Sequence, residues 1–360
     1  MVDDAQVDAD RVLDAFGARW TLDTSALVPA ARERLDRLWA RCRVPGVDGS
    51  AAGVEPFVVT DPDPYAVSRA ITLASLRRRR GTAVLLHAAG LESRGRAVAL
   101  VGPSGAGKST AALVLGRELG YLSDETVAVE PDGIVSPYPK PVSVVTDPGA
   151  PWDKHEEGPD ALGLREVGGT AYLQAVVVLE RDPVREVPEL APLPLVDAAI
   201  AVIAQSSSLT LLDRPLHRLA ELLSRSDGPY VLRYGEIAHC VDLVRDLLED
   251  RERPPREPWT TTPGSTTHAD THAPRPAGTL TRAPWHDALH GEGGSVVLVG
   301  EDVVRLGPVG EVVWTAAEAG IGVDEAVEAV VAALGEHPDA DRLVRERLDE
   351  LLRTGVLLSR

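Results

Sequence analysis

The sequence predicts an α/β protein followed by a separate C-terminal domain, and three observations support this fold class. Apolar runs typical of buried strands alternate with helical patterns between residues 82 and 249. One of these runs leads directly into a glycine-rich loop and then into an Ala/Leu-rich helix. A stretch rich in Pro, Thr and charge, without apolar periodicity, precedes a last segment with its own apolar pattern. We therefore expect a core domain over residues 1–250, a flexible linker over 251–278 and a second domain over 279–360.

The composition excludes several classes of function. The 360-residue chain carries 37 Lys and Arg against 55 Asp and Glu, a formal net charge of −18, which disfavours nucleic acid as a partner. No run approaches the roughly eighteen apolar residues of a membrane span, and the acidic N-terminus MVDDAQVDAD is unlike a signal peptide. We expect a cytoplasmic protein without a membrane partner. Cys42 and Cys240 lie far apart without metal-binding spacing, so oxygen ligands are expected for any metal.

Residues 1–80 are expected to pack against the rest of the core domain. Helical patterns at Ala30–Arg41 and Tyr65–Arg80 flank a Gly/Pro-rich middle at Pro45–Pro64. The second helix ends in four arginines, Arg77–Arg80, which suit the negative C-terminus of a helix dipole. In so acidic a chain this explanation is preferred to a nucleic-acid surface.

The pattern changes at Thr82, where two apolar runs, TAVLLHAAGL and RAVALVG, are joined by ESRG and predict a buried hairpin. A helix is predicted at Ser109–Leu119, and a short strand at Tyr121–Ser123 that ends in Asp124 and Glu125. Further strands are expected at Thr126–Glu130 and Ala175–Leu179, and helices at Pro194–Gln205, Leu212–Ser224 and Glu236–Glu249.

The second strand of the hairpin leads into GPSGAGKS, residues 102–109, which fits the pattern G-x-x-x-x-G-K-[ST] without a mismatch. Its glycines allow the backbone to wrap with its N–H groups turned inward, at the positive end of the following helix. Lys108 would then reach the β and γ phosphates, and the Ser109 hydroxyl would ligate Mg²⁺. The sequence therefore predicts binding of ATP and Mg²⁺ by Gly102, Ser104, Gly105, Ala106, Gly107, Lys108, Ser109 and Thr110.

Carboxylates beside the γ phosphate would decide the reaction. Asp124 and Glu125 follow the strand after the loop's own helix, so we expect them at the same carboxyl edge of the sheet. One can hold Mg²⁺ while the other accepts a proton from an attacking hydroxyl, and a pair of solvated acids in a turn is the alternative. Glu180, at the end of AVVVLE, is a rival Mg²⁺ ligand. His87 fits either a satisfied core histidine or a residue that the hairpin brings near the loop.

Lysine is rare in this Arg-rich chain. Lys108, Lys140 and Lys154 are the three that occur, and all fall within fewer than fifty residues. Because a compact ammonium and a guanidinium are not interchangeable among phosphate oxygens, retained lysines are candidates for chemistry. The sequence leaves the roles of Lys140, Lys154 and His155 open, with anion binding and chance clustering as the two interpretations.

Four motifs together, LLHAAGL, GPSGAGKST, YLSDETVAV and YPKPVSV, resemble the HPr kinase/phosphorylase superfamily, in its shorter branch found in peptide-modification gene clusters. The resemblance covers about residues 80–180, and weakly the flanks to about 250. It implies a P-loop-containing, HPr-kinase-like core in which Asp124 is the base that activates the acceptor hydroxyl. It also implies that Glu125 helps to hold the metal and that His87 is an active-site histidine.

Two departures limit that resemblance. Thr110 stands where the bifunctional members have an acidic residue, and their second glycine-rich signature has no clear match. The resemblance therefore does not extend to phosphorylase activity or to HPr as the substrate.

In residues 279–360, strands are expected at Ser295–Val299 and Val303–Leu306, and helices starting near Pro308, Val323 and Asp339. This stretch resembles PqqD-like domains, the small winged helix-turn-helix folds that capture the leader of a ribosomally made precursor peptide (RiPP recognition elements). The segment carries 7 basic and 15 acidic residues, a net charge of −8, which disfavours DNA as the partner of such a fold.

Together these features predict an ATP-dependent kinase that phosphorylates a Ser or Thr hydroxyl of a ribosomally synthesised precursor peptide, whose leader is held by residues 279–360. A flexible linker would raise the local concentration of the tethered peptide at the active site. Two alternatives are a kinase for a small molecule such as free serine, and a nucleotide-gated peptide-binding ATPase or chaperone in a peptide-maturation pathway. The sequence leaves open the acceptor and whether the chain forms a homo-oligomer.

Overall fold

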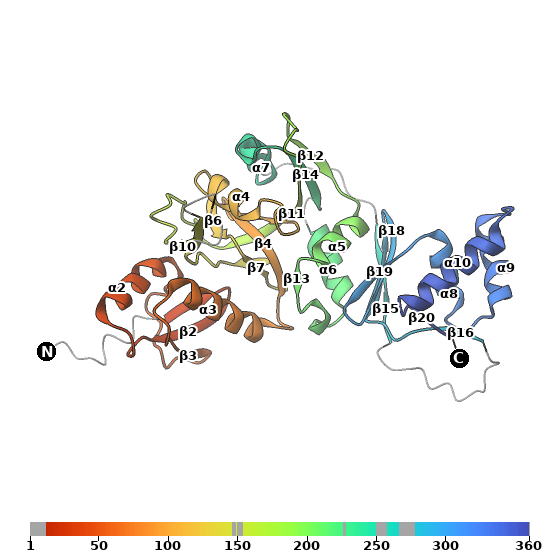
Figure 1. Cartoon of the computed structure of the whole chain (residues 1–360), viewed down its shortest axis with the longest axis horizontal. Coiled ribbons are helices and arrows are strands. Elements are labelled where there is room, and N and C mark those ends of the chain that lie inside the picture. Colours follow the sequence, from red (N-terminus) through yellow and green to blue (C-terminus); the bar gives the residue numbers. More distant parts are fainter. Residues whose placement is uncertain are drawn as a thin grey trace. The chain divides into compact units, whose positions relative to one another are not determined.

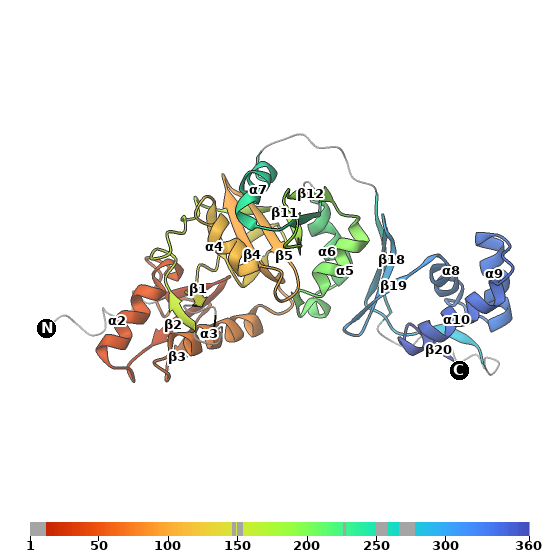
Figure 2. The ribbon, with the colours of Figure 1, turned by 45° about the horizontal axis from the view of Figure 1, so that its top comes forward.

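A computed structural model describes residues 12–145, 149, 154–225, 228–249, 258–265 and 278–359. The chain divides into two compact units, which Figure 1 and Figure 2 show in ribbon form. The first unit comprises residues 1–192, 204–209 and 225–253, and the second comprises residues 193–203, 210–224 and 254–360. Two segments inside the expected core domain thus group with the C-terminal part of the chain. Within the described ranges, no helix has both the length and the apolar character that a membrane span requires.

The first unit is built on a nine-stranded mixed sheet. Its main order is β12 (Glu189–Pro192), β14 (Tyr230–Tyr234), β11 (Ala171–Arg181), β5 (Arg96–Val101), β4 (Val84–Ser93), β7 (Thr126–Val129) and β8 (Ile134–Ser136), and both β6 (Gly120–Ser123) and β13 (Ser206–Ser207) pair with β4. Strands β5, β11 and β14 are parallel, whereas β4 runs antiparallel to β5. The predicted α/β class is confirmed, with a mixed sheet.

The predicted hairpin is confirmed as β4 and β5, which are joined by a tight turn at Arg94 and Gly95. Both turn residues have positive φ, of 53° and 79°, which matches the twist of the flanking strands. The expected strands after the glycine-rich loop are present as β6 and β7, and the expected strand around Val177 is longer, as β11. The helix after the loop, α4 (Lys108–Leu115), is shorter than expected.

Helices cover one face of this sheet. A core cluster joins apolar side chains of α4 with those of α7 (Val241–Leu247), and both pack on β5 and β11. A single helix was expected where the structure has the 3-10 turn η3 (Ile237–Cys240) followed by α7. The unit also contains a separate antiparallel pair, β9 (Val142–Val145) and β10 (Lys154–Glu157).

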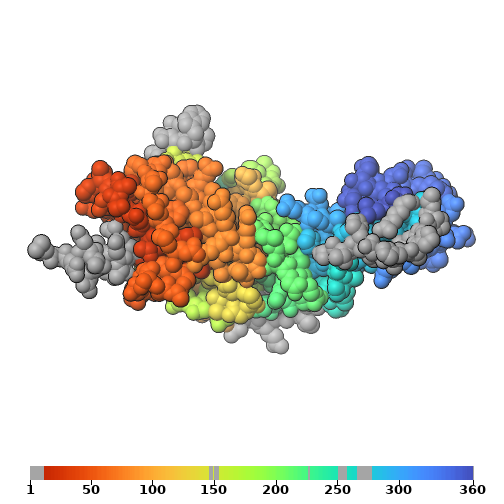
Figure 3. All heavy atoms as spheres, turned by 90° about the horizontal axis from the view of Figure 1, so that it is seen from below, coloured from red at the N-terminus to blue at the C-terminus, as the bar shows by residue number. Residues whose placement is uncertain are grey.

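The N-terminal region contains a three-stranded sheet that the sequence patterns do not predict. Its strands are β1 (Val12–Ala15), β2 (Ala18–Asp23) and β3 (Val54–Val58), and its helical elements are α2 (Pro29–Leu38), the 3-10 turn η1 (Ala40–Cys42) and α3 (Pro64–Arg79). Phe16 and Trp39 form its core together with Tyr138, whose ring meets that of Phe16 edge-on at 4.9 Å. In Figure 3 the red and orange atoms of the N-terminal part make up much of the visible surface of the first unit.

The second unit combines a four-stranded sheet with helices. The sheet order is β15 (Thr260–Pro263), β17 (Asp287–Gly291), β18 (Gly294–Val299) and β19 (Asp302–Leu306). The predicted helices are present as α8 (Pro308–Ala316), α9 (Val323–Leu334) and α10 (Ala340–Arg353), and β16 (Leu280–Arg282) pairs with β20 (Leu357–Ser359). The unit also contains α5 (Leu195–Ile203) and α6 (Pro215–Ser224), and the 3-10 turn η2 (Leu209–Leu211) lies between these two helices in the chain.

Part of the expected linker is a strand. Thr260–Pro263 pairs with β17 as β15, while residues 251–257 and 266–277 lie outside the described residues. Helix α6 joins this unit because the buried carboxylate of Asp287 accepts hydrogen bonds from the N–H groups of Leu216 and His217, at 3.1 and 2.9 Å. These N–H groups belong to the first helical turn, which has no acceptors of its own.

Candidate active site

The glycine-rich loop lies between β5, which ends at Val101, and α4, which begins at Lys108. Gly105 and Gly107 have φ of +85° and +92°, a region that L side chains rarely adopt. Helix α4 has no side-chain N-cap, so the N–H groups of its first turn lack an acceptor within the helix. Ser109 is exposed at this helix end. This arrangement offers several N–H donors to one anion.

Lys108 is buried in the loop, with 7% of its surface exposed. Its Nζ donates hydrogen bonds to the carbonyl oxygens of Gly102 at 2.6 Å and of Pro103 at 3.2 Å. Burial lowers the pKa of Lys108 below its usual value. Anionic oxygens would stabilise this partly desolvated ammonium better than neutral carbonyls do.

The strand register brings the predicted residues to the edge of the sheet where the loop begins. Because β4 is antiparallel to both β5 and β6, these two strands run in the same direction and end at the same edge. Ala88 pairs with Val101, just before the loop, and its neighbour His87 pairs with Thr126. The Glu125 carbonyl accepts a hydrogen bond from the Ala88 N–H and lies 3.1 Å from Nδ1 of the exposed His87 ring.

A single lysine forms ion pairs with both predicted carboxylates. The Lys140 Nζ lies 3.2 Å from Oδ1 of Asp124 and 3.3 Å from Oε2 of Glu125. Asp124 is buried and also accepts a hydrogen bond of 2.9 Å from the Tyr121 hydroxyl, whereas the Glu125 side chain is 38% exposed. Asp124 and Glu125 are therefore held by Lys140 and, for Asp124, by Tyr121, and they are not a pair of solvated acids.

Prolines and a tyrosine fix the position of Lys140. Lys140 lies in the proline-rich segment Pro137–Pro141. In this segment the Tyr138 N–H donates a 2.8 Å hydrogen bond to the Leu122 carbonyl near the end of β6. Burial by itself would lower the pKa of Lys140, but the negative charges of Asp124, Glu125 and Glu156 outweigh it and raise that pKa. The ammonium is therefore charged, and it pairs with carboxylates of the site itself.

A third carboxylate, Glu156 of β10, is buried and is one of the negative charges that raise the pKa of Lys140. It accepts hydrogen bonds from the hydroxyls of Ser68, at 3.1 Å, and of Ser143. Burial raises the pKa of Glu156. Sequence reasoning missed this residue, because nothing in the strand KHEE marks one of its acids as buried.

The other candidates are placed differently. Glu180 reaches the same edge on β11, but its carboxylate accepts a hydrogen bond of 2.9 Å from Arg233 and is half exposed. Lys154 is exposed on β10, and His155 Nε2 lies 3.3 Å from a Glu157 oxygen. The strand register thus places the start of the glycine-rich loop, Asp124, Glu125 and His87 at one edge of the sheet, and Lys154 and His155 lie on the separate strand β10.

The donor set fits a Mg²⁺ ion that binds with a nucleotide. The exposed Ser109 hydroxyl and the partly exposed Glu125 carboxylate carry oxygen donors of the kind that Mg²⁺ prefers. Among the described residues, no three His, Cys, Asp or Glu side chains form a group that could hold a metal ion.

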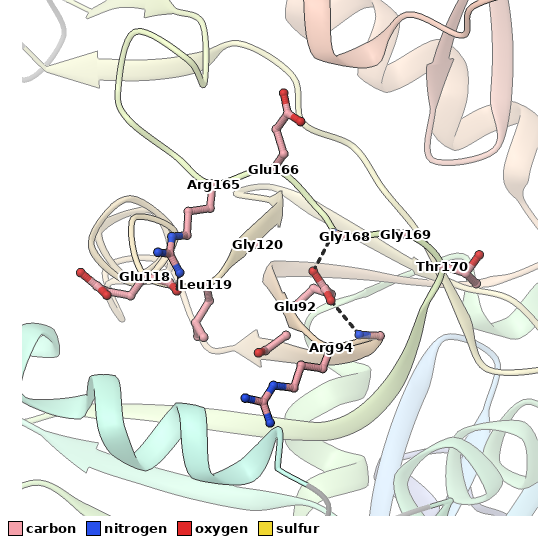
Figure 4. A pocket seen from close by; sticks show the side chains of 12 residues that line it. Glu92, Arg94, Glu118, Leu119, Gly120, Arg165, Glu166, Gly168, Gly169 and Thr170 are labelled. Atoms are coloured by element: carbon pink, nitrogen blue, oxygen red, sulfur yellow. Dashed lines mark hydrogen bonds between the residues drawn. The ribbon is translucent and has the colours of Figure 1, made fainter.

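A separate pocket of about 380 Å³ lies at the opposite ends of β4 and β5, beside Gly120 and residues 165–170 (Figure 4). The buried carboxylate of Glu92 points into this region, but it accepts hydrogen bonds from the N–H groups of Gly95, at 2.8 Å, and of Gly168, at 3.2 Å. Glu92 therefore fastens a turn and a loop to each other.

Comparison with known proteins adds little to this geometry. The chain matches no protein-family model and no curated protein. Among solved structures it is similar to the Hpr(Ser) kinase/phosphatase from Coxiella burnetii, with 12% sequence identity over 45% of this chain and 88% of that chain. The TM-score of 0.24 is too low for this likeness to transfer either a fold family or an activity.

Proposed function

We propose that this chain is an ATP-dependent kinase with an HPr-kinase-like core, which phosphorylates a Ser or Thr hydroxyl of a ribosomally synthesised precursor peptide. One observation carries the proposal. A glycine-rich loop with a buried lysine and a buried, ion-paired aspartate meet at one edge of a sheet. Phosphoryl transfer needs these two elements, a cradle for the phosphates and a base for the acceptor.

The loop residues would hold the nucleotide. The N–H groups of the loop and of the first turn of α4, together with Lys108, would bind its phosphates, and Ser109 and Glu125 would hold Mg²⁺. The bound Mg·ATP supplies the phosphoryl group and the screening of its charge. His87, exposed beside Glu125, would contact the acceptor or the terminal phosphate.

Asp124 is the proposed base. Tyr121 and Lys140 both contact its Oδ1, so we assign the proton of the acceptor hydroxyl to Oδ2. The acceptor oxygen forms a bond to the terminal phosphorus as the bond from that phosphorus to the bridging oxygen breaks. The Lys140 ammonium lies 3.2 Å from Oδ1, on the same oxygen as the Tyr121 hydroxyl, and therefore leaves Oδ2 free of these two contacts.

The peptide substrate is proposed from the second unit. Strand β19 is an edge of the four-stranded sheet, and the amphipathic α10 follows in the order expected of a PqqD-like winged helix. A leader peptide would add a strand to such an edge and rest on a helix. The net charge of −8 over residues 279–360 favours a peptide over DNA.

Intact mass after incubation with Mg·ATP tests the proposal. The full chain is mixed with a precursor peptide encoded beside its gene, and a gain of about 80 Da, one phosphoryl group, is expected. Asp124→Asn should abolish transfer and retain ATP affinity, whereas Lys108→Ala should weaken both. Glu180→Gln and Lys154→Ala are the matched controls and should leave transfer unchanged.

Other outcomes identify the alternatives. Phosphorylation of free serine that survives deletion of residues 279–360 would indicate a small-molecule kinase. Hydrolysis of ATP without any gain in mass by peptide or serine would indicate a nucleotide-gated binding protein and would contradict the kinase proposal.

A further inference from the structure

Tyr234 lies beneath the glycine-rich loop, and no sequence motif identifies it. It is the last residue of β14, and 1% of its surface is exposed. Its hydroxyl donates a hydrogen bond of 2.7 Å to the carbonyl oxygen of Ala106. The bond crosses from β14, two strands away from β5, to the residue that precedes Gly107 in the loop.

The geometry of the peptide bond gives this contact a consequence for the loop. The carbonyl of Ala106 and the N–H of Gly107 belong to one planar unit, and in a trans peptide these two groups point in opposite directions. There are no cis peptide bonds among the described residues. A hydroxyl that holds the Ala106 oxygen on the sheet side therefore turns the Gly107 N–H away from the sheet, toward the side on which an anion would enter.

We infer that Tyr234 is a positioning residue that presets the Gly107 N–H as a donor to the phosphates of a bound nucleotide. The inference rests on the proposed function, because it assigns a phosphate ligand to the loop. It adds to that function a residue that acts through the backbone and that the motif does not contain.

The neighbourhood of Gly107 supports the inference. A Cβ atom at Gly107 would lie 2.5 Å from the Tyr234 hydroxyl oxygen, and the φ of +92° also disfavours any side chain there. The hydroxyl and the glycine therefore occupy complementary space. The backbone of Tyr234 is itself fixed, since its carbonyl accepts a 2.8 Å hydrogen bond from the Asp182 N–H and β14 pairs with β11.

The hydroxyl remains a donor at neutral pH. Burial raises the pKa of Tyr234 above its ordinary value, so the phenol stays protonated. In this state it can donate to the Ala106 oxygen, which has no proton to offer.

Calorimetric binding to the full-length Tyr234→Phe variant tests the inference with three probes: Mg·ATP, magnesium pyrophosphate and adenosine. Because the Gly107 N–H would no longer be held in place, the affinity for the two phosphate probes should fall by about five- to tenfold. The affinity for adenosine, which has no phosphate, should stay within about twofold, because no base or ribose contact changes. Tyr172→Phe, which removes a hydroxyl from an exposed tyrosine on β11, is the matched control and should bind all probes like the wild type.

The failures are distinguishable. If the wild-type chain binds neither phosphate probe, the proposed function is wrong and this inference falls with it. If the wild type binds them and Tyr234→Phe binds equally well, the role of Tyr234 is refuted while the proposed function stands. If the variant loses affinity for adenosine to the same extent and its melting temperature falls, the hydroxyl acts through general stability and the inference is overturned.

Discussion

Replacing Lys140 by methionine tests the electrostatic arrangement of the site. The substitution keeps an unbranched side chain of similar length and removes the ammonium that lies 3.2 Å from Asp124 and 3.3 Å from Glu125. At an effective dielectric constant of about 20, each such contact corresponds to an attraction of about 5 kcal/mol before desolvation is subtracted. Solvent reduces the share of the partly exposed Glu125. Since breaking a buried pair strands the remaining charge, we expect a net destabilisation of about 3–5 kcal/mol.

The effect is local and needs a local measurement. Amide hydrogen exchange, read by mass spectrometry in peptides that cover β6 and β7, reports the free energy of opening next to Asp124. Lys154→Met is the matched control, because Lys154 is exposed on β10 and its loss should change that free energy by less than about 0.5 kcal/mol.

A second variant separates lost charge balance from lost packing. The double variant Lys140→Met/Asp124→Asn also removes the negative charge of the buried Asp124 carboxylate, which the single variant leaves without its ammonium partner. It should recover about half of the destabilisation or more. The reasoning is refuted if Lys140→Met differs from Lys154→Met by less than about 1 kcal/mol, or if the added Asn substitution brings no recovery.

Three further substitutions are expected to give defined results. Gly107→Ala places a methyl group against the Tyr234 hydroxyl and should lower the affinity for Mg·ATP at least about tenfold, as measured by calorimetry. Glu92→Ala leaves the N–H groups of a turn and a loop without their acceptor, and should destabilise the first unit by about 1–3 kcal/mol in thermal unfolding. Burial raises the pKa of Asp287, so its contribution to stability is complete below the unfolded value of about 3.9 and declines as the pH rises through the folded value. Asp287→Asn should remove this decline between about pH 4 and 7, the range that brackets a raised carboxyl pKa. Amide hydrogen exchange in α6, followed as a function of pH, measures the effect.

Local sequence signals predict those elements whose stability is also local. The β4–β5 hairpin follows from two apolar runs around a short polar turn, and the start of α8 follows from Pro308 at a position that needs no N–H partner. Strands β2 and β3 could not be predicted in this way, because their parallel pairing joins residues as distant in the chain as Arg19 and Val54. Strand β15 lacks apolar alternation, and it forms because its backbone pairs with β17.

The same distinction applies to the candidate site. Asp124 directly follows a predictable strand, β6, so the sequence is enough to predict that this residue lies at the sheet edge where the loop begins. Its partner Lys140 comes from a different segment, and the rarity of lysine marks the residue without indicating its partner. Tyr234 has no such mark, since a tyrosine that ends a buried strand is usually part of the core.

The charges at this edge of the sheet bear on why a metal would accompany the nucleotide. Asp124, Glu125 and Glu156 contribute three carboxylates around the single ammonium of Lys140, which leaves the group with an excess of negative charge. Lys108, in the loop, donates its hydrogen bonds to the carbonyl oxygens of Gly102 and Pro103. A metal-free triphosphate would therefore approach a net negative field, whereas a triphosphate that carries Mg²⁺ would meet a carboxylate able to bind the ion. If the proposed function holds, the paired acids would favour the metal complex over the free nucleotide, and Lys140 would offset part of their negative charge.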